Sequence, residues 1–244
     1  MKWFISADVH GYFDILKKAL DEAGFDRNNP EHFFVSLGDL LDRGKQPREC
    51  LQFINSLERK ILIRGNHEDL MEEMIAVHYP RTHDISNGTW YTAVDLTGKK
   101  NVDDILIAMK DNEDYNKYIN NTVDYYETKT GIFVHGWIPC LYWEGFSGVK
   151  KSWEYNPNWR DTLNWKPYRW LNGMEAWRNG IIEKDKTIYC GHWHSSWGNS
   201  RYHGDGSEFG EKANFNPFID NGIVALDACT AYSKKINVVV LEED

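Results

Sequence analysis

The chain has 244 residues, with 28 Lys and Arg against 37 Asp and Glu and a formal net charge of -9. This length allows one large α/β domain or two small ones. The acidic balance excludes a broad electrostatic surface for nucleic acid. The four cysteines form no CxxC pair, so no disulfide framework is expected. Because no apolar run approaches about 18 residues, we expect a cytoplasmic protein with no membrane partner.

Short apolar, β-branched or aromatic runs recur along the chain and predict strands. In chain order they are KWFISA at 2–7, HFFVSL at 32–37, KILI at 60–63, GIFV at 131–134, TIYC at 187–190, GIVAL at 222–226 and INVVVL at 236–241. Amphipathic segments at 12–25 and 46–59 separate the first three runs and predict helices, with Gly24 as the C-cap of the first. This alternation predicts a βαβ architecture with largely parallel strands.

Two regions interrupt the alternation. Residues 69–130 are mostly helical in pattern, whereas residues 141–180 are rich in Trp and show no clear periodicity. Both regions lie between predicted core strands, so we interpret them as insertions that form the rim of a cleft. No linker composition marks a second domain, and we expect one domain spanning 1–244.

Polar clusters follow five of the predicted strands. They are DVHG at 8–11, GDLLDRG at 38–44, GNHE at 65–68, HG at 135–136 and GHWH at 191–194. Because the carboxyl ends of parallel strands share one edge of a sheet, we expect these clusters to converge. A single His after a strand is more often structural, but the ordered set indicates a site. Its carboxylate, amide and imidazole groups suit divalent transition metals.

These blocks resemble the signatures of calcineurin-like metallophosphoesterases. The motif GDLLDRG followed by RGNHE resembles the motifs of the phosphoprotein-phosphatase branch, which includes bacterial and phage-type members. The C-terminal segment GIVALDACTAYSKKINVVVLE at 222–242 resembles the closing strands of the phage-like members. The resemblance implies an αββα sandwich, in which a central β-sandwich is flanked by helices, with a helical and a Trp-rich insertion.

The resemblance also implies two divalent metal ions, with Mn²⁺ favoured and Fe or Zn²⁺ as alternatives. The implied ligands are Asp8, His10 and Asp39 for the first ion, and Asp39 as a bridge, Asn66, His135 and His192 for the second. His194 resembles a further ligand of the wider superfamily that many phosphoprotein phosphatases lack. Two such ions would lower the pKa of a bridging water, giving a hydroxide for in-line attack on phosphorus.

The remaining implied roles concern catalysis and substrate. His67 would be the general acid, oriented by Asp42. Arg43 carries a fork of donors that matches phosphate oxygens, and Asn66 would face the substrate as well as the metal. A second phosphate-binding arginine is expected between the fourth and fifth clusters. Our choice for it is Arg169, with Arg160 and Arg178 as alternatives.

Glu68 completes the GNHE block but is not expected to bind metal. The resemblance implies that it supports the loop, with Arg64 or Arg43 as its partner.

The Trp-rich region combines rings with cations. Nine aromatic residues between 142 and 170 are interleaved with Lys150, Lys151, Arg160, Lys166 and Arg169, against three acidic residues. Such a surface suits stacking on a nucleobase or binding of a phosphorylated peptide. The alternative is that the rings pack a lid with little periodic structure. In either case we expect the lid to control substrate access.

Three functions compete. The favoured one is a metal-dependent phosphomonoesterase acting on phosphorylated Ser/Thr, or with dual specificity, in proteins. The alternative is a nucleotide or dinucleoside polyphosphate hydrolase, or a phosphatase of nucleic-acid ends, since a fold does not choose its substrate. The third is a non-catalytic binding protein of the same fold. The intact set of candidate ligands argues against the third.

Overall fold

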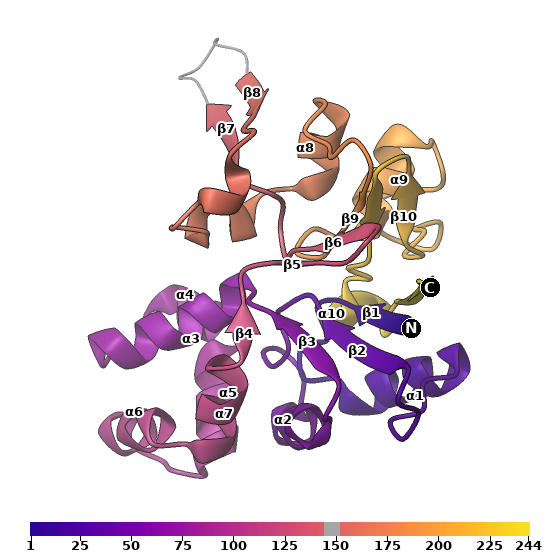
Figure 1. The fold of residues 1–244 in the computed structure, drawn as a ribbon. Helices are drawn as coiled ribbons and strands as arrows, with labels where there is room; N and C mark the ends of the chain where they lie inside the picture. Colours follow the sequence, from indigo (N-terminus) through magenta and orange to yellow (C-terminus); the bar gives the residue numbers. More distant parts are fainter. Residues whose placement is uncertain (144–151) are drawn as a thin grey trace.

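Two five-stranded β-sheets face each other at the centre of the computed structural model, which describes residues 1–143 and 152–244 (Figure 1). The first sheet has the order β12-β1-β2-β3-β4. Its strands are β1 (Lys2–Ser6), β2 (His32–Ser36), β3 (Lys60–Ile63), β4 (Thr122–Val123) and β12 (Val238–Glu242). Neighbours from β1 to β4 are parallel, and β12 runs antiparallel to β1.

The second sheet has the order β10-β11-β9-β6-β5. Its strands are β5 (Tyr126–Glu127), β6 (Gly131–Phe133), β9 (Thr187–Cys190), β10 (Phe218–Asp220) and β11 (Ile223–Ala225). The three central strands are parallel, and the two edge strands are antiparallel to their neighbours. A separate antiparallel hairpin, β7 (Cys140–Trp143) with β8 (Ser152–Tyr155), stands apart from both sheets (Figure 1).

Helices cover the outer faces of this sandwich. Those that contribute to the core beside the first sheet are α1 (Phe13–Ala23), α2 (Pro47–Ser56), α3 (Asn66–Val77), α5 (Thr89–Thr97), α6 (Val102–Lys110) and α7 (Glu113–Ile119), and α4 (Thr82–Ser86) contacts α3 and α5. Later in the chain come the 3-10 helices η1 (Trp159–Asp161) and η2 (Lys166–Trp170), then α8 (Gly173–Arg178), α9 (Ser195–Tyr202) and α10 (Thr230–Ser233). In the described parts of the chain, no helix combines the length and apolar character needed to cross a bilayer.

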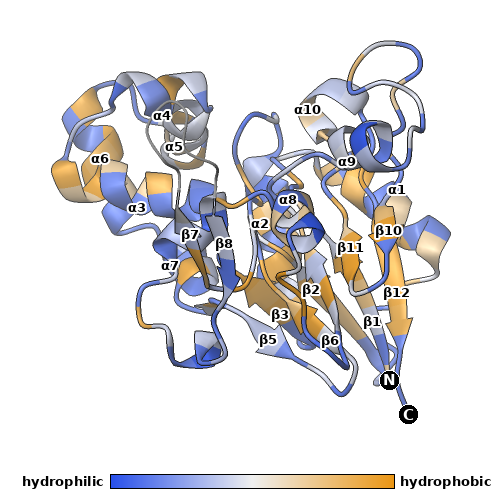
Figure 2. Ribbon diagram, turned by 90° about the horizontal axis from the view of Figure 1, so that it is seen from above, coloured by the Kyte–Doolittle hydropathy of each residue, from blue (hydrophilic) through white to orange (hydrophobic). Residues whose placement is uncertain are grey.

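Alternation along β1 explains why the sandwich forms. Successive side chains of a strand point to opposite faces. Accordingly, Trp3 and Ile5 pack between the two sheets with Phe133 and Val224, while Phe4 packs outward against the helices. Figure 2 shows the hydrophobic residues concentrated on the strands. A strand that is apolar on both faces needs a layer on each side.

The predicted αββα sandwich is confirmed, with one correction to the expected arrangement of its strands. All seven predicted strands are present within two residues of their expected ends, and Gly24 has the left-handed φ of 81° typical of a C-cap. However, the strands that precede the polar clusters belong to two sheets rather than one, since β1, β2 and β3 lie in the first and β6 and β9 in the second. The short strands β4, β5, β7, β8 and β10 were not predicted because runs this short carry little periodicity.

We predict that Ile5→Ala lowers the free energy of unfolding by about 2–5 kcal/mol, because the fully buried side chain of Ile5 fills the space between the sheets. The matched change Ile219→Ala removes a side chain that is 58% exposed on β10, and it should alter stability by less than about 0.5 kcal/mol. Urea unfolding of both variants measures the difference. Equal losses would contradict the layered core.

Candidate metal centre and active site

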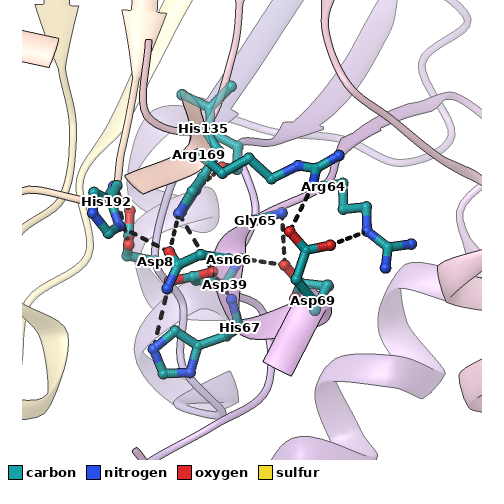
Figure 3. Close-up of polar contacts among 12 residues, drawn as sticks. Asp8, Asp39, Arg64, Gly65, Asn66, His67, Asp69, His135, Arg169 and His192 are labelled. Carbon is teal, nitrogen blue, oxygen red and sulfur yellow. Dashed lines mark hydrogen bonds and ion pairs between the residues drawn. The ribbon is translucent and has the colours of Figure 1, made fainter. Parts of the chain in front are cut away.

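The polar clusters of the first sheet begin where its parallel strands end. Asp8 follows β1, Asp39 follows β2 and Asn66 follows β3, and each side chain is 1–2% exposed (Figure 3). Backbone hydrogen bonds join the loops, since the Asp8 N–H donates to the Gly38 carbonyl at 3.3 Å and the His10 N–H to the Asp39 carbonyl at 2.9 Å. The strand ends thus bring acidic, amide and imidazole groups to one place.

Several residues of the candidate site have a strained backbone. Positive φ values occur at Asp8 (51°), His10 (50°), Asp39 (55°), Arg43 (73°) and His192 (64°). For residues with a side chain this left-handed conformation costs roughly 1–2 kcal/mol each. Such strain persists only where the surroundings hold it, and it clusters at functional sites.

Glu68 holds two of these loops together. Its buried carboxylate accepts the backbone N–H groups of Asp39 at 2.9 Å, Leu40 at 3.1 Å and Gly65 at 2.8 Å, and also the Tyr118 hydroxyl at 2.9 Å. The expected arginine partner is therefore wrong, because backbone amides and a tyrosine occupy the carboxylate. Glu68 nevertheless supports the loop, as expected.

Asp39 lies at the centre of a histidine cluster. Its Oδ1 is 3.4 Å from His135 Nε2, and its Oδ2 is 3.8 Å from His67 Nε2 and 3.9 Å from His10 Nε2. Burial alone raises the pKa of Asp39, but the neighbouring His135, His67 and His10 outweigh it and hold the pKa below its usual value. Asp39 is therefore an anionic carboxylate surrounded by imidazole rings.

Two groups of potential metal ligands share Asp39. The ligand atoms of His10, Asp39 and His67 lie within 4.8 Å of one another, and so do those of Asp39, His135 and His192. Asp8 lies beside them and accepts the His192 backbone N–H at 2.9 Å. Burial first, and then the charges of Asp227 and Asp39, raise the pKa of Asp8 well above its usual value. A cation close to these carboxylates would relieve that repulsion.

The hydrogen bonds around His135 fit a cation in the second group. His135 Nδ1 donates to the Leu37 carbonyl at 2.6 Å, so the ring directs its Nε2 lone pair toward Asn66 Oδ1 at 2.8 Å. His192 Nδ1 lies at the same distance from Asn66 Oδ1. Burial, followed by the charge of His135, lowers the pKa of His192 to about 3, which leaves its ring neutral. These lone pairs converge on one point, an arrangement that suits a divalent ion.

His67 is held by a buried carboxylate. Its Nδ1 lies 2.7 Å from Asp42 Oδ2, and the Thr89 hydroxyl donates to the same oxygen at 2.5 Å. Burial alone lowers the pKa of His67, but Asp39 and the hydrogen bond to Asp42 outweigh it and raise the pKa above its usual value. Arg43 Nη2 is 3.1 Å from His67 Nε2, so the predicted acid, its orienting carboxylate and a phosphate-binding candidate lie together.

Arg169 lies beside the centre, where its guanidinium contacts Asp69 (Figure 3) and also pairs with a second carboxylate. Nη1 donates to Asp69 Oδ2 at 2.6 Å, and Nη2 pairs with Asp124. Asp69 also accepts Arg64 Nε at 2.7 Å. A phosphate would compete with these carboxylates for the donors of Arg169.

The other two candidate arginines are engaged elsewhere. Arg160 pairs with Glu127 and Glu183, and Arg178 lies 5.8 Å from the centroid of the Tyr202 ring.

His194 differs from the other candidate ligands. Its Nδ1 lies 3.0 Å from the Ser196 hydroxyl, and its Nε2 lies 3.4 Å from Glu208 Oε1. Among the described residues it belongs to neither group that shares Asp39. The predicted ligand role of His194 therefore gains no support, because local partners occupy both ring nitrogens.

Sequence reasoning missed two buried residues of the site. Asp227 follows β11, and burial, the first cause, raises its pKa to about 6. Because it directly follows a predicted strand, the rule that identified Asp8 and Asp39 could have found it. Thr89 carried no such signal, since its contact with Asp42 joins residues 47 positions apart.

Comparisons with known proteins agree with this geometry. A family model described as calcineurin-like phosphoesterase matches residues 1–218. Serine/threonine-protein phosphatase 1 of Salmonella typhimurium is 33% identical over 89 residues, which cover 36% of this chain and 40% of that protein. The symmetrical bis(5'-nucleosyl)-tetraphosphatase of Glaesserella parasuis is 36% identical over 69 residues, covering 28% and 25%. The matched segments thus span well under half of these relatives.

Solved structures show the same fold along the whole chain. A cold-active protein tyrosine phosphatase has a TM-score of 0.58 at 17% identity, covering 99% of this chain and 73% of that one. A putative diadenosine tetraphosphatase has a TM-score of 0.52 at 14% identity, covering 98% and 89%. The family model spans the strands from β1 to β9 and all five polar clusters, and it ends at the start of β10, before β11, Asp227 and β12. The chain belongs to the calcineurin-like phosphoesterase family, whose members use a dinuclear metal centre.

Proposed function

We propose that the protein is a metal-dependent phosphomonoesterase. The observation that carries this proposal is the pair of ligand groups that share Asp39, next to a histidine held by its own carboxylate. In this assignment Asp8, His10 and Asp39 hold one ion, and Asn66, His135 and His192 hold the other, with Asp39 between them. When bound, two such ions polarise the phosphoryl oxygens and lower the pKa of a water for in-line attack.

The chain's own residues supply the remaining chemistry. Arg43 is exposed and directs one guanidinium nitrogen to His10 Nε2 and another to His67 Nε2. In the proposed complex this fork would bind phosphate oxygens instead, which would free His67 Nε2 to carry a proton. Asp42 fixes the His67 ring through Nδ1, which leaves Nε2 to give a proton to the leaving-group oxygen. Arg169 and Asn66 complete the proposed contacts with the substrate.

The substrate class has two candidates. Phosphorylated Ser/Thr in proteins is our first expectation, and one relative is a serine/threonine-protein phosphatase. A nucleotide is the second, and another relative is a bis(5'-nucleosyl)-tetraphosphatase. Mixed nitrogen and oxygen ligands support Mn²⁺ as the native metal, with Fe or Zn²⁺ as alternatives. The four unpaired cysteines are consistent with the expected cytoplasmic location.

The protein loaded with Mn²⁺ should release phosphate from p-nitrophenyl phosphate, and it should hydrolyse bis(p-nitrophenyl) phosphate at least about tenfold more slowly, a difference of roughly 1.4 kcal/mol in transition-state discrimination. Absorbance at the nitrophenolate band follows both reactions. Absence of turnover with two ions bound would instead support a non-catalytic binding protein.

Replacing His67 by Asn should lower kcat by about 10²–10⁴-fold, because it removes the proposed proton donor, yet both ions should stay bound. The change His192→Asn should remove one ion, because it deletes a ligand of the second group. Metal content by mass spectrometry and phosphate release distinguish the two variants. Loss of an ion in His67→Asn would make His67 a ligand, as its distance to Asp39 also allows.

Replacing Thr89 by Val should lower kcat by about tenfold while metal content stays constant. The change preserves the buried shape but removes a hydrogen bond to a charged carboxylate, worth about 1.5–3 kcal/mol. Thr89→Ser should restore most of kcat. Thr92→Val serves as the matched control, because Thr92 is also buried on α5. An equal loss in both Val variants would mean general destabilisation of α5 rather than misplacement of Asp42.

A further inference from the structure

An aromatic cleft of about 680 Å³ lies beside the metal centre, between the β7–β8 hairpin, η2 and the loop after β9. Its aromatic wall consists of Tyr142, Trp153, Tyr168, Trp170, Trp193 and Trp197. A volume of this size lies within the ~300–1,000 Å³ typical of small-molecule sites. Neither the proposed metal ligands nor His67 line it, so the cleft is a separate feature of the surface.

The cleft adjoins the metal centre, because two tryptophans of its wall contact His192. The centroid of the Trp170 ring is 5.7 Å from that of His192, and the centroid of the Trp193 ring is 6.1 Å away. Trp170 is 46% exposed and Trp193 is 38% exposed, which leaves parts of both large rings open to a ligand.

The aromatic residues of the Trp-rich region divide into two groups. Trp159 and Trp165 are buried at 0% and 4% exposure and pack against Tyr125, so they belong to the core of the lid. Trp170 and Trp193 remain partly exposed at the cleft. Packing of the lid therefore explains the first pair but leaves the second pair unexplained.

The charges around the cleft are not those of a basic surface. Arg160 pairs with Glu127, Lys166 with Glu73, and Arg169 with two aspartates. Glu175 is the one charged residue among the described residues that line the cleft. Of the predicted cations, Lys150 and Lys151 lie outside the described residues. The cleft thus suits an uncharged planar group better than a chain of phosphates.

We propose that the aromatic cleft binds the nucleobase of a nucleotide whose phosphate ester occupies the metal centre. This inference rests on the proposed phosphomonoesterase function and assigns its substrate class. Every base has a π face, and aromatic side chains stack on it. A tyrosine ring is bonded directly to its phosphate oxygen and stays beside the metals. A nucleobase is separated from its phosphate by a sugar, so it can reach cleft walls such as Trp197, which contacts Trp193.

The test compares three substrates with the Mn²⁺-loaded protein: adenosine 5'-monophosphate, a phosphoserine peptide and a phosphotyrosine peptide. We expect kcat/KM for the nucleotide to exceed that for the phosphoserine peptide by at least about tenfold, mainly through KM. Preference for the phosphotyrosine peptide, or no preference, would overturn the nucleobase assignment. Phosphomonoesterase activity would stand in either case.

Variants place the preference in the cleft. Trp170→Leu and Trp193→Leu should each lower the ratio of kcat/KM for nucleotide over phosphoserine peptide by about tenfold, as expected for loss of one stacking partner. The ratio is measured within one variant, so it does not depend on the fraction of active protein. Tyr79→Leu is the control, because it removes an aromatic residue that is 64% exposed away from the cleft. Unchanged ratios in both Trp variants would overturn the proposal.

A binding measurement separates the cleft from the chemistry. Adenosine, which has no phosphate, should quench tryptophan fluorescence of the metal-free protein, and Trp193→Leu should weaken that binding by about tenfold. If no monoester is hydrolysed although two ions are bound, the proposed phosphomonoesterase function is wrong. Adenosine binding then tests the assignment of the cleft to a nucleobase independently of catalysis. Absence of adenosine quenching would overturn the cleft assignment.

Discussion

The candidate site depends on one buried carboxylate. Glu68 is 3% exposed, and burial followed by the charge of Asp39 raises its pKa, so an ionised Glu68 has to be compensated by donors. It finds them in the backbone amides of Asp39, Leu40 and Gly65. These amides belong to the loops after β2 and β3, which carry the central carboxylate, Asn66 and His67. The Glu68 carboxylate therefore stabilises the left-handed backbone at Asp39. Removing this carboxylate would leave three backbone N–H groups without a hydrogen-bond acceptor.

The loops after β1 and β2 also connect the two sheets. The Leu37 carbonyl, after β2, accepts a hydrogen bond from Nδ1 of His135, which follows β6. The Asp8 carboxylate, after β1, accepts one from the backbone N–H of His192, which follows β9. Each bond joins a residue of the first sheet to one of the second. The proposed ligands of the first ion come from the first sheet, whereas those of the second come from both. Binding of the second ion is consequently coupled to the packing of the sandwich, in addition to the apolar layer around Ile5 and Phe133.

Local pattern predicted the strands and the polar clusters at their ends, because both are written in short stretches of sequence. Local pattern did not predict contacts between residues that are far apart in the sequence. Arg64 was a plausible partner for Glu68, yet the structure pairs it with Asp69, one residue further along. The role of Arg169 depends on Asp69 and Asp124, which lie 100 and 45 residues away in the chain. The sequence pattern likewise could not distinguish buried from exposed tryptophans, because the surrounding fold determines that Trp159 is buried and Trp170 is partly exposed.

Residues 169 and 170 join the two parts of the proposed substrate site. Arg169 pairs with Asp69, the neighbour of Glu68, while the indole of Trp170 contacts the ring of His192 and forms part of the aromatic cleft. One short segment therefore faces the phosphate side, a proposed ligand of the second ion and the proposed base subsite. A nucleobase stacked on Trp170 would contact the ring that packs against His192, so recognition of the base and the geometry of the second ion are expected to be linked through this segment.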